Sequence, residues 1–290
     1  MNGILLIDKP EGWTSSDVVA KLRGVLHEKR LGHSGTLDPM ATGLLVLFAG
    51  RAARAVEFAE SHEKRYLARL RLGITTDTQD ITGSAIKTAA ADISPEQLEA
   101  ALAEFRGQIS QVPPMYSAIK IKGQKLYELA RRGENVERKP RDITISALEI
   151  LGRDGEDWLL DVTCSKGTYI RTLCNDIGEA LGCGGCMSAL RRLRCGEFEL
   201  ENAHTIDEVQ QAADRGEAES LLLPVDRLFA DAPAHTAGAK AERVIRCGGA
   251  PKTALGAGEY RVYSEGGEFL ALCRSDGQTL KTVKSFFEPA

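Results

Sequence analysis

Two different periods of hydrophobic and polar residues run along this chain, and they predict both helices and strands. Apolar residues recur at helical spacing over 16–27, directly after a run of helix-capping residue types at 14–17. Over 66–72 apolar side chains instead occupy every second position, as they do in a half-buried strand. Strands and helices are mixed without strict alternation, which favours the α+β class.

Local start and stop signals place further elements. Ser94, Pro95 and Gln97 form a capping box with proline at the first helical position, and Gly133 ends a short helix predicted from 126. Two more helices are expected over 169–181 and 206–215. The remaining strands are expected at 4–7, 44–48, 119–123, 143–151, 158–164, 259–263, 268–273 and 279–287.

The length of 290 residues suits one large or two modest domains. Apolar residues make up 43% and charged residues 27% of the chain, which excludes a wholly disordered protein. Residues 232–239 are rich in Ala, Gly, Pro and Thr and are interpreted as a linker. We therefore expect a large domain over 1–231 and a small β-rich domain over 240–290.

The sequence indicates a cytoplasmic protein. Its longest purely apolar run spans 44–49, whereas a membrane-spanning helix needs about 20 residues, so no membrane association is expected. No basic stretch precedes the apolar residues near the N-terminus, so no signal peptide is expected. The seven cysteines are an odd number, which favours reduced thiols. No heptad pattern predicts a coiled coil, so a monomer is the default expectation.

Cofactor motifs are few. Cys183 and Cys186 have a spacing found in zinc sites, but no second pair completes a known zinc pattern, so no metal is expected. A phosphate-binding Walker loop and a strand–GxGxxG–helix unit are both absent from the sequence, which leaves a nucleotide cofactor without support.

Charge is distributed unevenly around a net value of −4. Residues 201–231 carry a net −6, whereas 112–146 carry a net +4. Arg191, Arg192 and Arg194 form a second basic cluster. Such patches bind phosphates in some proteins and are merely solvated in many others, and charge alone favours the second interpretation.

Three residues are candidates for chemistry. Asp38 lies in a glycine-bounded loop, and the following proline restricts its backbone; most Asp-Pro pairs, however, are simply turns. Arg171 lies near the start of a predicted helix, where it could pair with a carboxylate such as Asp38 and keep it ionised, or could simply be a surface arginine. Tyr66 could cover the core or stack on a base.

Six sequence blocks stand out along the chain: GILLIDKP-x-G-x-TS at 3–15, GH-x-GTLDP-x-ATG at 32–43, KRY at 64–66, PMYSA at 114–118, SKGTYIR at 165–171 and LRRL at 190–193. Taken together, and in this order, they resemble the TruB family of pseudouridine synthases. The last 50 residues resemble the family's PUA-like RNA-binding tail only loosely.

The resemblance implies a fold and a reaction. The fold would be the pseudouridine synthase catalytic fold over 1–231, with a mixed, largely antiparallel central sheet, followed by a PUA-like domain over 240–290. The reaction would convert uridine to pseudouridine at position 55 in the T arm of tRNA: the N1 glycosidic bond breaks and C5 bonds to the ribose. The reaction would use no metal or organic cofactor, and the protein would require no protein partner.

The resemblance also implies roles for individual residues. Asp38 would be the nucleophile, attacking either ribose C1′ or uracil C6, and Arg171 would hold it ionised and oriented. Tyr66 would stack on the uracil and help to remove the C5 proton. His33 would support the T loop after the uridine is flipped out. The remaining expected substrate-binding residues are Tyr169, Leu190, Lys9 and Lys64.

An insertion over about 107–146 resembles the family segment that grips the T arm. Its expected contacts to the RNA backbone are Lys120, Lys122, Lys125, Arg131 and Arg132. Two other functions stay open: a non-catalytic RNA chaperone, which would not need Asp38, and a guide-dependent relative acting on another RNA. The absence of long basic extensions favours the stand-alone bacterial type.

Overall fold

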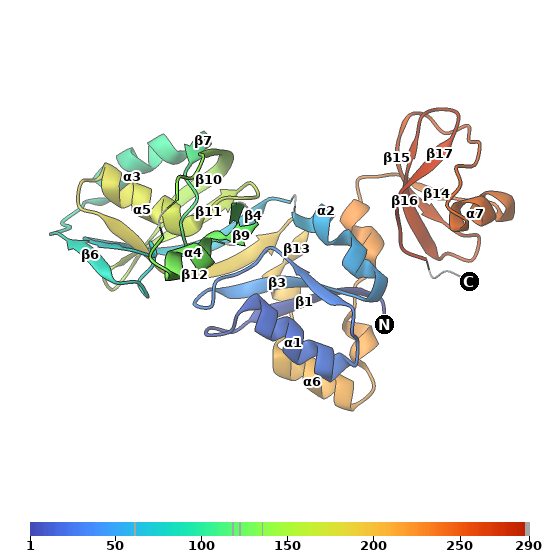
Figure 1. Cartoon of the computed structure of the whole chain (residues 1–290), viewed down its shortest axis with the longest axis horizontal. Coiled ribbons are helices and arrows are strands. Elements are labelled where there is room, and N and C mark those ends of the chain that lie inside the picture. The colour runs from blue at the N-terminus through green and yellow to red at the C-terminus, as the bar shows by residue number, and fades with distance from the viewer. Residues whose placement is uncertain (61, 118, 122, 135, 288–290) are drawn as a thin grey trace.

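The computed structural model describes residues 1–60, 62–117, 119–121, 123–134 and 136–287 (Figure 1). Its centre is a nine-stranded sheet of order β1-β3-β12-β4-β11-β10-β7, with β2 added to β3 and β13 added to β12. The strands are β1 (Gly3–Lys9), β2 (Leu31–Ser34), β3 (Thr42–Ala49), β4 (Lys64–Leu72), β7 (Gly107–Gln111), β10 (Arg141–Asp154), β11 (Asp157–Cys164), β12 (Gly185–Cys195) and β13 (Phe198–Glu199).

Neighbouring strands of this sheet run antiparallel except where β3 meets β12, which confirms the expected mixed, largely antiparallel sheet. The parallel junction is short, because only Arg191 with Thr42 and Arg192 with Gly43 are in register. Strand β12 therefore joins the N-terminal part of the sheet to the part formed by β4, β11, β10 and β7.

Helices cover the sheet and bury its apolar side chains. Helices α1 and α6 contact each other and share a core with β1 and β3. Helices α3 and α5 pack beside the other part of the sheet, as Figure 1 shows. The helices are α1 (Ser15–Leu26), α2 (Val56–Glu60), α3 (Pro95–Leu102), α4 (Leu126–Arg131), α5 (Ile170–Ala180), α6 (Ile206–Asp214) and α7 (Ala239–Arg246). None of the helices in the described ranges is both long and apolar enough to cross a membrane.

Two small hairpins project from the sheet. One pairs β5 (Ile74–Thr76) with β6 (Ala85–Thr88), and the loop between them carries residues 77–84. The other pairs β8 (Lys120–Ile121) with β9 (Gln124–Lys125) and leads directly into α4. In Figure 1, β6 lies at the far end of the half of the molecule that carries α3 and α5, whereas β9 and α4 lie closer to β4 and β12.

A separate four-stranded sheet of order β14-β15-β16-β17 forms the C-terminal part of the chain. The interpretation of 232–239 as a linker was wrong, because β14 runs parallel to β15 and α7 follows immediately. A three-residue edge strand is too short to show an alternating pattern. The strands are β14 (Ala234–Thr236), β15 (Gly258–Tyr263), β16 (Phe269–Ser275) and β17 (Leu280–Ser285).

This small sheet packs against the region around α2 rather than standing free (Figure 1). The ring of Phe229 lies 6.2 Å from that of Phe269 and 5.9 Å from that of Phe286. An ion pair of 2.6 Å joins Lys284 of β17 to Glu57 of α2. Aromatic packing therefore fixes where the C-terminal sheet sits on the rest of the chain.

Replacing Gly43 by alanine is expected to destabilise the fold strongly. Gly43 has φ +95°, and a Cβ there would lie 2.3 Å from the backbone oxygen of Arg192 at the short β3–β12 junction. We expect a loss of at least about 2 kcal/mol in the free energy of unfolding, measured by urea denaturation. Gly24 of α1 is the matched control: a Cβ added there would have no other atom within 4 Å, so Gly24→Ala should stabilise by about 0.5–1 kcal/mol. A Gly43→Ala protein as stable as wild type would contradict this account.

Candidate active site

Asp38 lies on the loop between β2 and β3, and neighbouring segments fix the backbone of this loop. The Ser15 hydroxyl at the start of α1 accepts from the Leu37 amide at 2.9 Å and donates to the Leu37 carbonyl at 3.2 Å. The Gly12 amide donates to the carbonyl of Pro39 at 2.8 Å. The blocks at 3–15 and 32–43 are therefore in direct contact, and together they hold the carboxylate in place.

The buried side chain of Lys9 also links the blocks at 3–15 and 32–43 through hydrogen bonds. Its side chain is fully buried, and its ammonium donates to the carbonyls of Pro10 at 2.9 Å, Trp13 at 2.6 Å and Pro39 at 3.2 Å. Burial lowers the pKa of Lys9 to about 8, an effect that Asp38 opposes. These bonds use all three ammonium donors. A direct contact of Lys9 with substrate stays a prediction, and in this structure the ammonium supports the loop.

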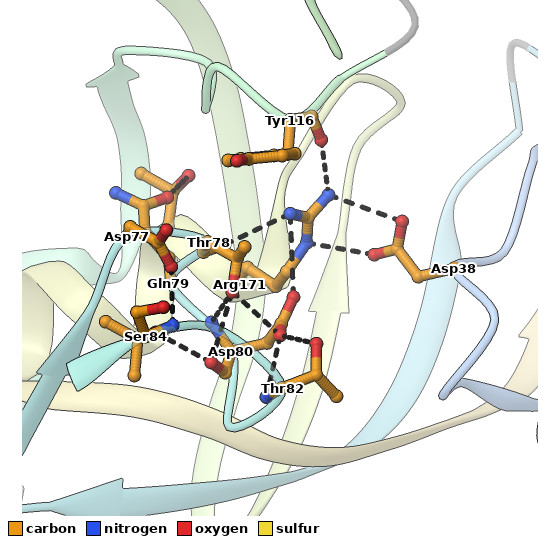
Figure 2. A network of polar contacts seen from close by, with 11 residues as sticks. Asp38, Asp77, Thr78, Gln79, Asp80, Thr82, Ser84, Tyr116 and Arg171 are labelled. Atoms are coloured by element: carbon orange, nitrogen blue, oxygen red, sulfur yellow. Dashed lines mark hydrogen bonds and ion pairs between the residues drawn. The ribbon is translucent and has the colours of Figure 1, made fainter. Parts of the chain in front are cut away.

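Arg171 pairs with Asp38 through two contacts, as Figure 2 shows. Its Nε lies 2.9 Å from Asp38 Oδ2, and its Nη2 donates to Oδ1 at 3.3 Å. The arginine is the second residue of α5 and is 7% exposed, whereas the Asp38 side chain keeps 37% of its surface accessible. The forked guanidinium thus fixes the carboxylate in one orientation while a face of the carboxylate stays open.

Other partners hold the arginine itself (Figure 2). Its Nη1 donates to the Thr78 carbonyl at 3.1 Å, and its Nη2 donates to the Tyr116 carbonyl at 2.7 Å. A second carboxylate, Asp80, lies 3.7 Å from Nη1. The guanidinium therefore joins the Asp38 loop, the 77–84 loop and the start of the insertion at one point.

Asp80 is a residue of this site that the sequence interpretation missed. One of its oxygens accepts from the Thr78 hydroxyl at 2.9 Å and from the amide and hydroxyl of Thr82 at 3.1 and 2.5 Å. The Thr-x-Asp-x-Thr spacing at 78–82 is typical of a turn closed by side chains. Nothing in that local spacing indicates that the turn meets Arg171, which is 91 positions further along the chain than Asp80.

Burial and charge act on the Asp38 carboxyl in opposite directions. Burial raises its pKa and is the largest effect; the charge and hydrogen bond of Arg171 lower it, Asp80 raises it and Lys9 lowers it. The net result is a pKa above the ordinary value for aspartate. Arg171 acts in the direction expected from the sequence, but it offsets the cost of burying the carboxylate only in part.

Tyr66 and Leu190 form part of an apolar wall beside the Asp38 loop. They lie on the adjacent strands β4 and β12 and share one buried cluster with Leu37, Ala41 and Ile170. Tyr66 is 9% exposed, and burial raises the pKa of its phenol to about 12. The structure thus brings both residues predicted from the sequence to the element that carries Asp38.

Tyr169 caps the start of α5, two residues before Arg171, and is half-buried. The buried amide of Gln111 at the end of β7 fixes its backbone: Oε1 accepts from the Tyr169 amide at 2.8 Å, and Nε2 donates to the Tyr169 carbonyl at 3.1 Å. Burial raises the pKa of Tyr169, and the Ser117 hydroxyl and nearby arginines, including Arg171, lower it. Gln111 is thus a second supporting residue that sequence patterns did not single out.

His33 and Lys64 lie at the edges of this region. His33 is half-buried in β2, where burial and then the charge of Arg192 lower the pKa of its imidazole and favour the neutral ring. Lys64, at the start of β4, is 6% exposed and donates to the His62 carbonyl at 2.5 Å. Their predicted contacts with substrate stay predictions.

Three of the predicted backbone-contact residues, Lys125, Arg131 and Arg132, lie on α4 or at its ends. The ammonium of Lys125 and the guanidinium of Arg131 lie 5.3 and 5.6 Å from the ring centre of Tyr127. Arg132 is exposed and pairs with Glu134 at 2.7 Å. Lys122 lies outside the described residues, as does the side chain of Lys120.

Cys183 and Cys186 are both buried and carry free thiols. The Cys183 thiol donates to the Gly184 carbonyl at 3.4 Å, and burial raises the pKa of Cys186 to about 11. Within the described ranges, no group of three or more His, Cys, Asp or Glu side chains could hold a metal ion.

Comparisons with known proteins agree with this geometry. Residues 23–170 match the family model described as "TruB family pseudouridylate synthase (N terminal domain)", and 171–230 match "tRNA pseudouridylate synthase B C-terminal domain". A curated protein of Clostridium kluyveri named "tRNA pseudouridine synthase B" is 41% identical over 99% of this chain and 100% of its own length. Another of that name, from Alkaliphilus oremlandii, is 50% identical over 78% of this chain and 75% of its own length.

Solved structures show the same fold. The chain aligns with a protein in a crystal structure of a Cbf5-Nop10-Gar1 complex at a TM-score of 0.76 and 25% identity, covering 99% of this chain and 85% of that one. The family models match 23–230 and thereby include Asp38, Tyr66 and Arg171. The chain therefore belongs to the TruB family of pseudouridylate synthases.

Proposed function

We propose that this protein isomerises uridine to pseudouridine at position 55 in the T arm of tRNA. The observation that carries the proposal is the open Asp38 carboxylate, held by two contacts to the nearly buried Arg171 within the family's sequence blocks. The names of the curated relatives support the choice of tRNA as substrate, since proteins 41–50% identical to this chain are called tRNA pseudouridine synthase B.

In the proposed reaction Asp38 is the nucleophile, attacking ribose C1′ or uracil C6. A carboxylate needs a free lone pair and a fixed direction to do this, and Arg171 supplies the orientation without covering the whole group. The target uridine must leave its stack to reach Asp38, so the enzyme flips the nucleotide into the site. The proposed reaction uses no metal or organic cofactor.

The surrounding side chains would receive the flipped base. Tyr66 stacks on the uracil and takes part in removing the C5 proton, and Tyr169 and Leu190 line the pocket. His33 supports the T loop where the uridine has left, a place suited to a neutral imidazole. Lys9 and Lys64 complete the proposed substrate-binding set, Lys9 through the loop that it holds.

The proposed grip on the RNA lies outside the catalytic centre. Lys125, Arg131 and Arg132 contact the T-arm backbone together with Lys120 and Lys122, which adds affinity without reading sequence. We propose a catalytic domain over 1–231 with the insertion at about 107–146, and a PUA-like RNA-binding domain formed by the C-terminal sheet. That sheet begins at β14, six residues before the expected boundary at 240.

We further propose that the chain acts as a monomer in the cytoplasm, without a protein partner or a guide RNA. The structural relative was solved in a Cbf5-Nop10-Gar1 complex. Whether this chain needs protein partners for activity is therefore tested directly. Activity of the purified chain on a tRNA transcript alone would separate the two modes.

The direct test is tritium release from a tRNA transcript labelled at uracil C5. The purified protein alone should release one tritium per tRNA, and a transcript with cytidine at position 55 should release none from the T arm. Tight tRNA binding with no release would instead favour a binding-only RNA chaperone. Release from a uridine outside the T arm would reject the proposed position.

The rate should fall in acid with an apparent pKa above that of an ordinary aspartate. Burial raises the pKa of Asp38, and the ionised form is the nucleophile, so protonation removes activity as the pH falls through this raised value. We expect the acid limb of the single-turnover rate to lie above about pH 3.9. The measurement is that rate between pH 4 and 8, with circular dichroism at each pH as the control for folding. A rate that stays constant down to pH 4 in folded protein would contradict this prediction.

A further inference from the structure

Arg192 is a buried cation near the centre of the molecule to which neither the family blocks nor the proposed reaction assigns a role. Its side chain is 1% exposed on β12, and no ion pair among the described residues includes it. A buried guanidinium without a carboxylate partner costs several kcal/mol. Such a group calls for an explanation beyond packing.

The guanidinium lies against the loop that leads to Asp38. Its Nε donates to the Leu44 carbonyl at 2.6 Å, and a Cβ placed on Gly35 would lie 3.1 Å from its Nη1. Gly35 has φ +68°, so glycine suits this position for both its backbone conformation and its size. The Nη2 atom is buried and has no hydrogen-bond acceptor within bonding distance among the described residues.

Sheet register places Arg192 beside Tyr66. The two residues are directly opposite on the antiparallel strands β12 and β4, and opposite residues project to the same face of a sheet. The charge and N–H groups of Arg192 lower the pKa of the Tyr66 phenol, against burial and the neighbouring thiols Cys164 and Cys195, which raise it. Arg192 is therefore the cation that favours negative charge on the Tyr66 oxygen.

We propose that Arg192 is a positioning residue that orients the Tyr66 hydroxyl and stabilises negative charge on its oxygen while this oxygen takes the proton from uracil C5. This inference rests on the proposed function. The phenol proton first leaves to water, and the phenolate then binds the C5 proton. The C5–H electron pair becomes the C5–C6 double bond, and the electrons of the N1–C6 double bond move to N1, which takes a proton from water.

The test separates an electrostatic role from a structural one. Arg192→Gln should slow single-turnover pseudouridine formation by about 10²-fold, a typical loss for impaired general-base catalysis, while tRNA affinity stays near the wild-type value. Incorporating 3,5-difluorotyrosine at position 66, which lowers the phenol pKa, should restore rate in Arg192→Gln much more than it changes the wild-type rate. Arg191→Gln is the matched control: its guanidinium is partly exposed and pairs with Asp8 at 2.7 Å, so fluorination should bring no such rescue there.

Two outcomes would overturn the inference: an Arg192→Gln rate within about threefold of wild type, or a slow variant that fluorination does not rescue. If Arg192→Gln does not fold, Arg192→Lys takes its place, because it keeps the charge without the planar fork. It should give an intermediate rate and the same direction of rescue, and no rescue there would also overturn the inference. Wild-type protein inactive on tRNA would contradict the proposed function instead, so the two failures are distinguishable.

Discussion

Replacing Asp38 with asparagine should abolish pseudouridine formation while leaving tRNA binding intact. Asparagine keeps nearly the same volume and can still accept a hydrogen bond from Arg171, but its amide oxygen is a very poor nucleophile. We expect the single-turnover rate to fall by about 10⁴-fold or more, as is found when an essential nucleophile is removed. The measurement is C5 tritium release, with tRNA affinity determined on the same preparation.

Asp161 provides a matched control for this substitution. It is also an aspartate held by a forked arginine, since Arg65 Nε and Nη2 donate to its oxygens at 3.0 and 2.6 Å, but it lies in the middle of β11. Asp161→Asn should turn over close to the wild-type rate. If Asp38→Asn also reacted at that rate, Asp38 could not be the nucleophile, and the proposed mechanism would be wrong.

Local signals in the sequence were sufficient to predict most elements around the site. The capping box predicted at Ser94 is present, and the expected helix starts near 16 and 206 are capped by Thr14 and Thr205. The alternation over 66–72 predicted β4, and burial alternates along that strand in the structure. These features are readable because a cap or an alternating pattern depends on residues only a few positions apart.

Strand β12 shows what local patterns could not predict. It carries arginines at 191, 192 and 194, it is interrupted by two register irregularities, and it pairs with strands that lie more than 100 residues earlier in the chain. Its arginines were interpreted as a possible basic surface, whereas Arg192 is buried. Only tertiary packing decides which side of a strand the rest of the chain covers.

The candidate site was predicted only in part, because some of its contacts also depend on tertiary packing. The pairing of Asp38 with Arg171 followed from complementary charge and the family resemblance, and the structure has it at 2.9 Å. Asp80 and Gln111 were missed, because each reaches the site by a contact between segments far apart in sequence. Lys9 is buried, and its ammonium donates to backbone carbonyls. Its motif did not indicate this either.

Arg171→Met should damage both catalysis and stability. The substitution removes the contacts to Asp38, Asp80 and the carbonyls of Thr78 and Tyr116, and it leaves the buried Asp80 and the partly exposed Asp38 without their cation. Breaking a fully buried pair typically costs about 3–5 kcal/mol, and solvent at Asp38 reduces this cost, so we expect a loss of about 2–3 kcal/mol in the free energy of unfolding. The single-turnover rate should fall by about 10³-fold, because the nucleophile loses its orientation.

The stability loss should also depend on pH in a defined direction. Arg171 is the strongest influence lowering the pKa of Asp38, so its removal raises that pKa further above the ordinary value. A carboxyl with a raised pKa in the folded state destabilises the fold when it is charged, so the deficit of the variant should be larger at pH 8 than at pH 5. Urea unfolding at the two pH values measures this difference.

Arg215→Met is the control, because its guanidinium is 58% exposed and pairs at 2.7 Å with Glu217, which is itself 57% exposed. A pair exposed on both sides contributes about 1 kcal/mol or less, so that variant should stay close to wild type in stability and rate. Equal losses of stability and rate in the two variants would mean that burial does not account for the contribution of the Asp38–Arg171 pair. A loss confined to Arg171→Met, and reduced at low pH, would tie the raised pKa of the nucleophile to the same guanidinium that orients it.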